Sequence, residues 1–205
     1  MRRRSRWGSG VALLTGVLVL LSACASSHEA HYPGGTSLKV QTPDLVALKK
    51  HTDVPNCPKV GPQGSGLPAV TLSCLGGGRS VDVAGLRGPL ILNFWASWCG
   101  GCKQEMPALA AYAKSQSGVK VLGVDFLDPA PDKALELAAS SKVAYPLVAD
   151  PNGALDRRAP LPHPPGLPFT VFLDAKGHIA HAEATVFGSE QEVAAAARKY
   201  LGTGG

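Results

Sequence analysis

The segment that decides the fold reads Trp95-Ala96-Ser97-Trp98-Cys99-Gly100-Gly101-Cys102. It continues a near-continuous apolar run over residues 90–95, which predicts a central strand buried on both faces. Between residues 106 and 113, apolar residues recur on one side of a helical pattern. The two cysteines therefore lie where a buried strand ends and a helix begins, within the first turn of that helix.

This placement predicts an activated thiol at Cys99. Unpaired N–H groups at a helix N-terminus carry partial positive charge, which favours thiolate over thiol. Thiolate is the nucleophile in disulfide exchange, and such placement lowers a cysteine pKa from about 8.5 to roughly 3.5–7.5. Two intervening residues bring the sulfurs within bonding range and leave Cys102 more sheltered. We expect Cys99 to attack a disulfide and Cys102 to resolve the mixed disulfide.

The rest of the chain predicts one α/β domain over residues 56–203, with an N-terminal hairpin extension and one mixed central sheet flanked by helices. We expect a hairpin of residues 69–75 and 79–83, strands over 90–95, 119–124, 145–148, 169–173 and 178–185, a helical turn at 153–158, and helices over 132–141 and 191–201. Pro107 should kink the helix that follows the cysteines, because proline removes a helix hydrogen bond.

The first 23 residues have the layout of an export signal. Four arginines precede an apolar run over residues 11–21, which is shorter than the roughly 20 residues of a spanning helix. The run ends in Leu21-Ser22-Ala23-Cys24, which resembles the bacterial lipobox. That resemblance implies a lipidated Cys24 as the first mature residue, anchored at the extracytoplasmic face of the cell membrane. An uncleaved signal anchor, or secretion with an incidental cysteine, is the alternative.

Residues 24–55 are polar and predict a flexible tether, with at most one short helical turn near Leu45. The chain carries a net charge of +5, but without the four arginines of the first six residues the net charge is +1. A nucleic-acid-binding protein should keep a basic stripe on its folded part. This charge distribution therefore excludes nucleic acid as a partner.

Over residues 67–201 the chain resembles the thioredoxin superfamily, and within it the extracytoplasmic TlpA/ResA-like branch. The motifs that carry the resemblance are the segment over residues 94–102, Glu105-Met106-Pro107 and Gly166-Leu167-Pro168-Phe169. Two positions depart from the pattern. Gly101 stands where the family usually has proline, so a redox potential cannot be transferred, and Asn93 stands where thioredoxin proper keeps a buried acid.

The resemblance implies further site residues. Pro168 should be cis and face the cysteine pair, while the backbone of Leu167 pairs with the substrate chain and Trp98 adds to the substrate-binding surface. Glu105 is the expected proton source for Cys102, because it lies on the same helix face and a partly buried carboxyl has a raised pKa. A solvated surface glutamate is the alternative for Glu105.

Cys57 and Cys74 remain once Cys24 is assigned to lipidation and the active pair is set aside. In an oxidising compartment they should form a structural disulfide. A loop of about 17 residues would contribute roughly 3 kcal/mol in the chain-entropy model. A second redox pair that relays electrons is the alternative.

Other chemistries fit the cysteines less well. A zinc site needs a second ligand pair, and sixteen residues separate Cys57 from Cys74. A peroxiredoxin would need one peroxidatic cysteine in a different setting, and the two tryptophans argue against it. The six histidines show no ligand spacing. We therefore expect no metal and no cofactor.

The leading hypothesis for function is a membrane-anchored reductase, similar to those that keep apocytochrome c cysteines reduced. Its partners would be proteins with disulfides and a membrane electron donor of the CcdA/DsbD type. One alternative is an oxidase or isomerase for secreted proteins. Another is a non-enzymatic lipoprotein that binds copper through Cys99 and Cys102.

Overall fold

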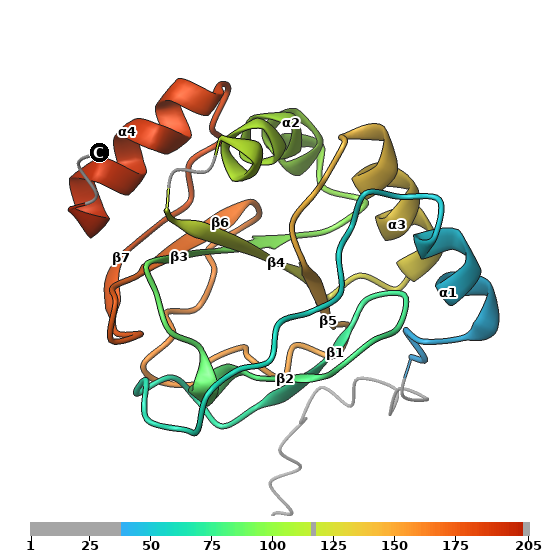
Figure 1. The fold of residues 1–205 in the computed structure, drawn as a ribbon, viewed down its shortest axis with the longest axis horizontal. Helices are drawn as coiled ribbons and strands as arrows, with labels where there is room; N and C mark the ends of the chain where they lie inside the picture. Colours follow the sequence, from blue (N-terminus) through green and yellow to red (C-terminus); the bar gives the residue numbers. More distant parts are fainter. Residues whose placement is uncertain (1–37, 116–117, 203–205) are drawn as a thin grey trace, which may run out of the picture. The chain divides into compact units, whose positions relative to one another are not determined.

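The computed structural model describes residues 38–115 and 118–202, so Cys24, the expected export signal and the first part of the expected tether lie outside the described residues. Within these ranges seven strands form one mixed sheet in the order β2-β1-β5-β4-β3-β6-β7 (Figure 1). The strands are β1 (Thr71–Cys74), β2 (Val81–Asp82), β3 (Leu90–Trp95), β4 (Lys120–Phe126), β5 (Leu147–Asp150), β6 (Phe169–Leu173) and β7 (Ile179–Glu183). The helices are α1 (Pro43–Lys49), α2 (Gly100–Lys114), α3 (Pro131–Ser140) and α4 (Glu190–Leu201).

The centre of the sheet is parallel and its edges are antiparallel. Strand β4 pairs in parallel with both β3 and β5, while β6 pairs antiparallel with β3. The β1–β2 hairpin joins the sheet through an antiparallel pairing of β1 with β5. The predicted α/β class with a mixed central sheet and an N-terminal hairpin is confirmed.

Two buried clusters lie on opposite faces of this sheet. On one face, sheet residues such as Ile91 and Phe172 pack against residues of α1, α2, α3 and α4 (Figure 1). On the other face, Leu92 and Phe94 pack against the hairpin and against loop residues that include Leu155. Strand β3 is buried along its whole length because helices cover one side of it and loops cover the other.

The ordered fold begins earlier than the sequence predicts. Thr42 accepts a hydrogen bond from the backbone N–H of Leu45 and so caps helix α1, which starts with Pro43. Leu45 is buried in the cluster below the helices, together with Val40 and Val54. The expectation of a flexible tether is therefore wrong for residues 38–55, because the buried side chains of Val40, Leu45 and Val54 pack this segment against the domain.

Smaller differences concern the second half of the chain. Residues 153–158 form turns and not the predicted helical turn, and β5 begins two residues later than predicted, after Pro146. Helix α2 continues through Pro107. None of the helices in residues 38–115 and 118–202 has the length and apolar character needed to cross a bilayer.

Candidate active site

Cys99 and Cys102 form a disulfide with an S–S distance of 2.06 Å and a Cα–Cα distance of 5.3 Å. Cys99 is the N-cap of α2, and its sulfur accepts the backbone N–H of Cys102 at 3.0 Å. Cys99 is 5% exposed and Cys102 is 0% exposed. The sulfur nearer the surface therefore also receives the helix N–H, which is the arrangement that stabilises a thiolate at Cys99.

The loop that leads to Cys99 is fixed by a buried acid that the sequence did not single out. Asp128 accepts the backbone N–H of Ser97 through Oδ2 and that of Ala130 through Oδ1. Asp128 also acts on Asp125 in strand β4. Burial is the main cause that raises the pKa of Asp125 well above its ordinary value, and the negative charge of Asp128 is the second cause. An Asp that follows a buried strand and precedes Pro129-Ala130 could have been read as a loop-capping residue.

Trp98 is the large aromatic residue beside the cysteine pair, and it is 58% exposed. Its indole N–H donates to the backbone oxygen of Leu127 at 3.3 Å, which orients the ring on the surface. A large exposed aromatic ring that is held at its polar end leaves its apolar face open to contact with another chain.

Glu105 lies three residues after Cys102 on α2 and is fully buried. Its Oε2 accepts the side-chain N–H of Asn93 at 3.0 Å, and its Oε1 accepts the backbone N–H of Phe187 at 3.4 Å. Burial raises the pKa of Glu105 to about 7, although these two hydrogen bonds act in the opposite direction. A carboxyl with this pKa can donate and accept protons near neutral pH, and it is not a solvated surface glutamate.

The neighbours of Glu105 form a polar row across the sheet. The Asn93 amide donates to Thr170 Oγ1 at 3.1 Å as well as to Glu105. Thr170 pairs in register with Asn93 on one side and with Glu183 on the other. The charge of Glu183 further raises the pKa of Glu105. The sequence signal for this row was a polar residue inside the apolar run of β3.

Pro168 and Gly101 are brought together from distant parts of the chain. The Leu167–Pro168 peptide bond is cis. A Cβ at Gly101 would lie 3.0 Å from Pro168 Cδ, 3.1 Å from Val186 Cγ2 and 4.0 Å from the backbone oxygen of Leu167. Glycine therefore allows Pro168 to approach the first turn of α2 closely, directly beside the cysteine pair.

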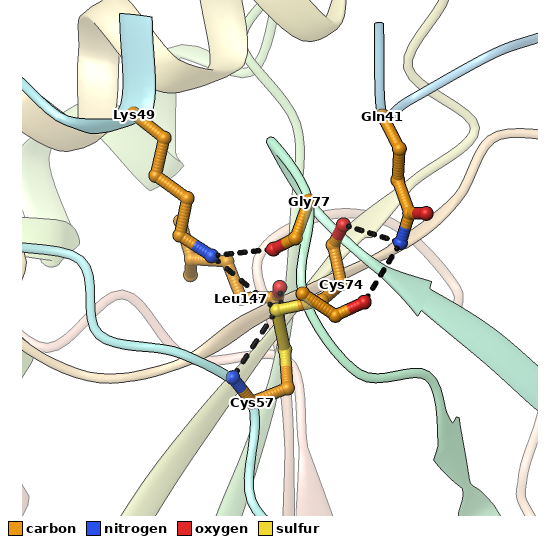
Figure 2. Close-up of a disulfide and its surroundings, with 7 residues drawn as sticks. Gln41, Lys49, Cys57, Cys74, Gly77 and Leu147 are labelled. Atoms are coloured by element: carbon orange, nitrogen blue, oxygen red, sulfur yellow. Dashed lines mark hydrogen bonds between the residues drawn. A yellow bond between two sulfur atoms is a disulfide. The ribbon is translucent and has the colours of Figure 1, made fainter. Parts of the chain in front are cut away.

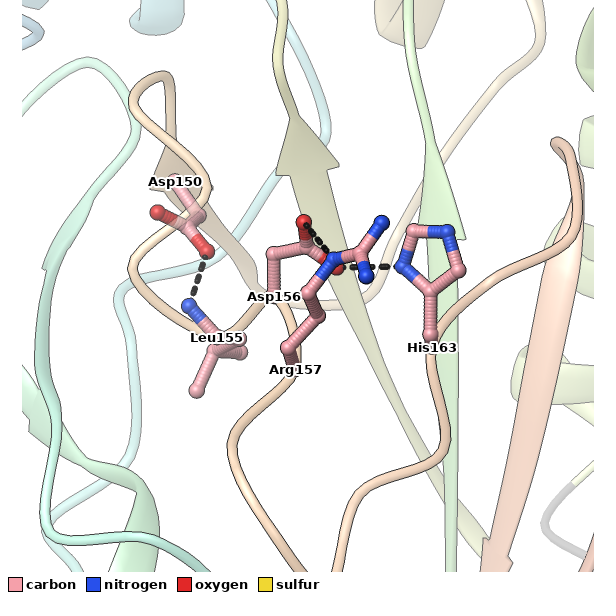
Figure 3. A network of polar contacts seen from close by, with 5 residues as sticks. All are labelled: Asp150, Leu155, Asp156, Arg157 and His163. Atoms are coloured by element: carbon pink, nitrogen blue, oxygen red, sulfur yellow. Dashed lines mark hydrogen bonds and ion pairs between the residues drawn. The ribbon is translucent and has the colours of Figure 1, made fainter. Parts of the chain in front are cut away.

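The long loop before Pro168 is held by side-chain contacts (Figure 3). Asp150, the last residue of β5, accepts the backbone N–H groups of Ala154 at 2.6 Å and Leu155 at 2.8 Å. Asp156 pairs with the ring of His163. These contacts connect the start of the loop to its middle. They hold the loop in place ahead of Leu167, where it reaches the active site.

Cys57 and Cys74 form a second disulfide, with an S–S distance of 2.07 Å. Both belong to the buried cluster on the loop-covered face, whereas Cys99 and Cys102 belong to the cluster on the helix-covered face. No group of three or more potential metal ligands occurs among the residues that the structure describes.

Comparison with known proteins finds thiol:disulfide interchange proteins among the relatives of this chain. Residues 64–182 match the AhpC/TSA family. The thiol:disulfide interchange protein DsbE of Pseudomonas fluorescens is 35% identical over 118 residues, which are 57% of this chain and 63% of that protein. The thiol:disulfide interchange protein HelX of Rhodobacter capsulatus is 34% identical over 128 residues, which are 61% of this chain and 69% of that protein.

The fold is also found among solved structures. A secreted disulfide oxidoreductase of Mycobacterium tuberculosis superposes with a TM-score of 0.52 at 23% identity, over 62% of this chain and 96% of that one. At this identity the match establishes the fold. The predicted thioredoxin-like architecture is therefore confirmed.

Proposed function

Because the chain belongs to the AhpC/TSA family and is a thiol–disulfide oxidoreductase like its named relatives, we propose that it reduces disulfides of extracytoplasmic proteins through Cys99 and Cys102. One observation carries this proposal: the Cys99 sulfur receives a helix N-terminal N–H, while Cys102 is buried one turn before a carboxyl with a pKa near 7. That asymmetry supports attack by Cys99 and resolution by Cys102.

In the first step, the Cys99 thiolate attacks one sulfur of the substrate disulfide. The substrate S–S bond breaks, its second sulfur leaves as a thiolate, and a mixed disulfide joins Cys99 to the substrate. The N–H of Cys102 and the terminus of α2 stabilise the attacking thiolate. The exposed ring of Trp98 and the backbone of Leu167, next to Pro168, would hold the substrate chain across the pair.

In the second step, the Cys102 thiolate attacks the Cys99 sulfur, the bond between Cys99 and the substrate breaks, and the substrate sulfur leaves as a thiolate that takes a proton from solvent. Cys102 is fully buried, so its thiolate is costly unless the proton has a nearby acceptor. Glu105 lies one helical turn further along α2, and in this proposal it takes this proton and returns it when the pair is reduced again. Asn93 holds the carboxyl in place by its hydrogen bond to Oε2.

The surroundings of the pair favour the reducing direction. Gly100 and Gly101 place no cationic side chain between the cysteines, so backbone N–H groups are the stabilising donors for the Cys99 thiolate. A strongly oxidising pair holds its reduced form by much greater thiolate stabilisation. We therefore infer a reductase, recharged by a membrane dithiol carrier of the CcdA/DsbD type and acting on proteins such as apocytochrome c.

The N-terminal sequence supports an extracytoplasmic location. The lipobox-like Leu21-Ser22-Ala23-Cys24 would place a diacylglycerol group on Cys24 after removal of residues 1–23. Residues 24–37 would then form a shorter tether than the sequence suggested, because the folded domain already includes residues 38–55.

Insulin reduction tests the activity. The wild-type protein should accelerate reduction of insulin by dithiothreitol, and Cys99→Ser should abolish the acceleration. Cys102→Ser should accumulate a mixed disulfide through Cys99, because the resolving thiol is absent. Stoichiometric copper(I) bound at the pair, together with negligible insulin reduction, would refute the proposal in favour of a metal-binding lipoprotein.

A further inference from the structure

The Cys57–Cys74 disulfide has an asymmetric environment that a purely structural bond does not need. Figure 2 shows Lys49 and the Cys57 backbone N–H both directed at the sulfur of Cys74. The Lys49 Nζ lies 3.4 Å from Cys74 Sγ, and the Cys57 nitrogen lies 3.2 Å from the same sulfur. Cys74 Sγ is therefore faced by two N–H donors, one of them an ammonium group.

Lys49 is buried without an anion. It is 7% exposed, and its other hydrogen bond goes to the neutral backbone oxygen of Gly77 at 3.0 Å. Within residues 38–115 and 118–202, no carboxylate forms an ion pair with Lys49, and burial alone lowers the pKa of its amine. A buried cation is unfavourable unless it is paired. The anion that would pair with it is the thiolate that Cys74 becomes on reduction.

The sulfur of Cys57 has the opposite surroundings. It lies 3.2 Å from the backbone oxygen of Leu147, which is a hydrogen-bond acceptor (Figure 2). After reduction, a Cys57 thiol could donate its proton to this oxygen, whereas a Cys57 thiolate would be repelled by it. The site therefore distinguishes the two sulfurs: Cys57 is favoured as a thiol and Cys74 as a thiolate.

Access to the bond also differs between the two cysteines. Cys57 is 6% exposed and Cys74 is 0% exposed. A surface pocket of about 440 Å³ is lined by Lys49, by Asn56 next to Cys57 in sequence, and by the glycines at positions 76–78, although neither cysteine lines it. Gly78 presents no side chain toward the bond, since a Cβ there would lie 3.5 Å from Cys74 Sγ. Of the two sulfur-bearing residues only Cys57 has any exposed surface, so Cys57 is the one that a small thiol meets first.

We propose that Cys57–Cys74 is a second redox site, a disulfide that accepts two electrons from a dithiol reductant, with Cys57 as the sulfur attacked and Cys74 as the leaving thiolate. One thiol of the reductant loses its proton to solvent and its thiolate attacks Cys57 Sγ. The S–S bond breaks and its electron pair remains on Cys74, beside the Lys49 ammonium. The second thiol of the reductant then attacks the reductant sulfur that is bonded to Cys57. The mixed disulfide breaks, and Cys57 leaves as a thiol with the proton of the attacking thiol.

The products are the oxidised reductant, a Cys57 thiol, a Cys74 thiolate and one released proton. The bond ties the segment after α1 to strand β1, so its reduction would remove the covalent link between that segment and the sheet. This inference goes beyond the structural role that the sequence suggested for these cysteines, and it does not depend on the chemistry of Cys99 and Cys102.

The first test measures the redox equilibrium of this bond alone. In the full chain with Cys99→Ser and Cys102→Ser, Cys57–Cys74 is equilibrated with dithiothreitol at pH 7, and the reduced fraction is read by alkylation and peptide mass. Lys49→Met should lower the equilibrium constant for reduction by about tenfold or more, because it removes the charged donor to the thiolate. Lys50→Met, which changes the exposed neighbouring lysine, should leave the constant unchanged. Equal constants for Lys49→Met and its parent would overturn the proposal.

The second test uses the same Cys99→Ser, Cys102→Ser chain with Lys49 unchanged. Its result therefore does not depend on whether the Lys49→Met variant folds. A short pulse of 2-mercaptoethanol followed by acid should trap the adduct on Cys57, with Cys74 as the free thiol. An adduct found on Cys74, or a bond that opens only under denaturing conditions, would overturn the assignment. Because both active-site cysteines are absent, neither result depends on the proposed reductase activity.

Discussion

Replacing Glu105 by glutamine removes the ionisable group that the proposed mechanism requires, and the size of its effect follows from the pKa. In the folded protein burial raises the pKa of Glu105 to about 7, against 4.5 for an exposed glutamate. One pKa unit corresponds to about 1.36 kcal/mol. The folded protein should therefore be destabilised by roughly 3 kcal/mol when this carboxyl is ionised.

The sign of the pH dependence follows from proton binding. Between pH 4.5 and 7 the folded state keeps a proton on Glu105 that the unfolded state has lost, so the contribution to stability falls as pH rises through this window. Above pH 7 the loss is constant. From pH 5 to pH 8, the wild type should lose about 2.5 kcal/mol of unfolding free energy relative to Glu105→Gln.

Urea unfolding of the oxidised protein at pH 5 and pH 8 measures this difference. Glu136→Gln is the matched control, because Glu136 lies exposed on α3 and solvent screens its surface ion pair with Lys133 at either pH. A pH dependence that is the same in the wild type and in Glu105→Gln would refute the argument from burial.

The same variant separates a catalytic role from a structural one. Glu105→Gln should slow disulfide exchange and flatten its pH dependence near pH 7, because the proton acceptor for Cys102 is gone. Equal exchange rates for the two proteins from pH 5 to pH 9 would show that Glu105 does not serve the cysteines, whatever its effect on stability.

Three further predictions concern other parts of the chain. Protein from native membranes should have an intact mass that begins at an acylated Cys24, and an unmodified Cys24 behind an intact N-terminus would indicate a signal anchor. Gly100→Ala should raise the unfolding free energy by up to about 1 kcal/mol, because a Cβ there has nothing within 4 Å. Gly101→Ala should gain less or lose stability, because its Cβ would crowd Pro168 and Val186. Asp128→Ala should cost about 1 kcal/mol in urea unfolding, because it leaves the partly buried N–H of Ser97 without its acceptor, and an unchanged midpoint would contradict this.

The elements that the sequence predicted well are those set by local pattern. The bounds of β3 and β6 agree with the prediction, because each strand is a mostly apolar run that is buried on two faces. Helix α4 agrees within one residue, since Ser189 caps it and Gly202 ends it with a φ of 65°. Helix α1 was read as tether because only its packing against the domain stabilises so short a segment.

The same distinction applies to the site. The cysteine pair was recognisable because strand, cysteines and helix are contiguous in sequence. The contact of Asn93 with Glu105 and that of Lys49 with Cys74 join residues 12 and 25 positions apart, on different elements. Such contacts depend on how helices pack on the sheet, and a single sequence does not encode them in any local pattern.

The reduction potential of Cys99–Cys102 tests the central claim most directly. The pair is equilibrated with reduced and oxidised glutathione, and its redox state is read from the peptide that carries both cysteines, separately from Cys57–Cys74. Because the residues between the cysteines carry no cationic side chain and a backbone N–H faces the Cys99 sulfur, the potential should lie toward that of thioredoxin, about −270 mV. A value near that of DsbA, about −120 mV, would contradict the reductase and identify an oxidase.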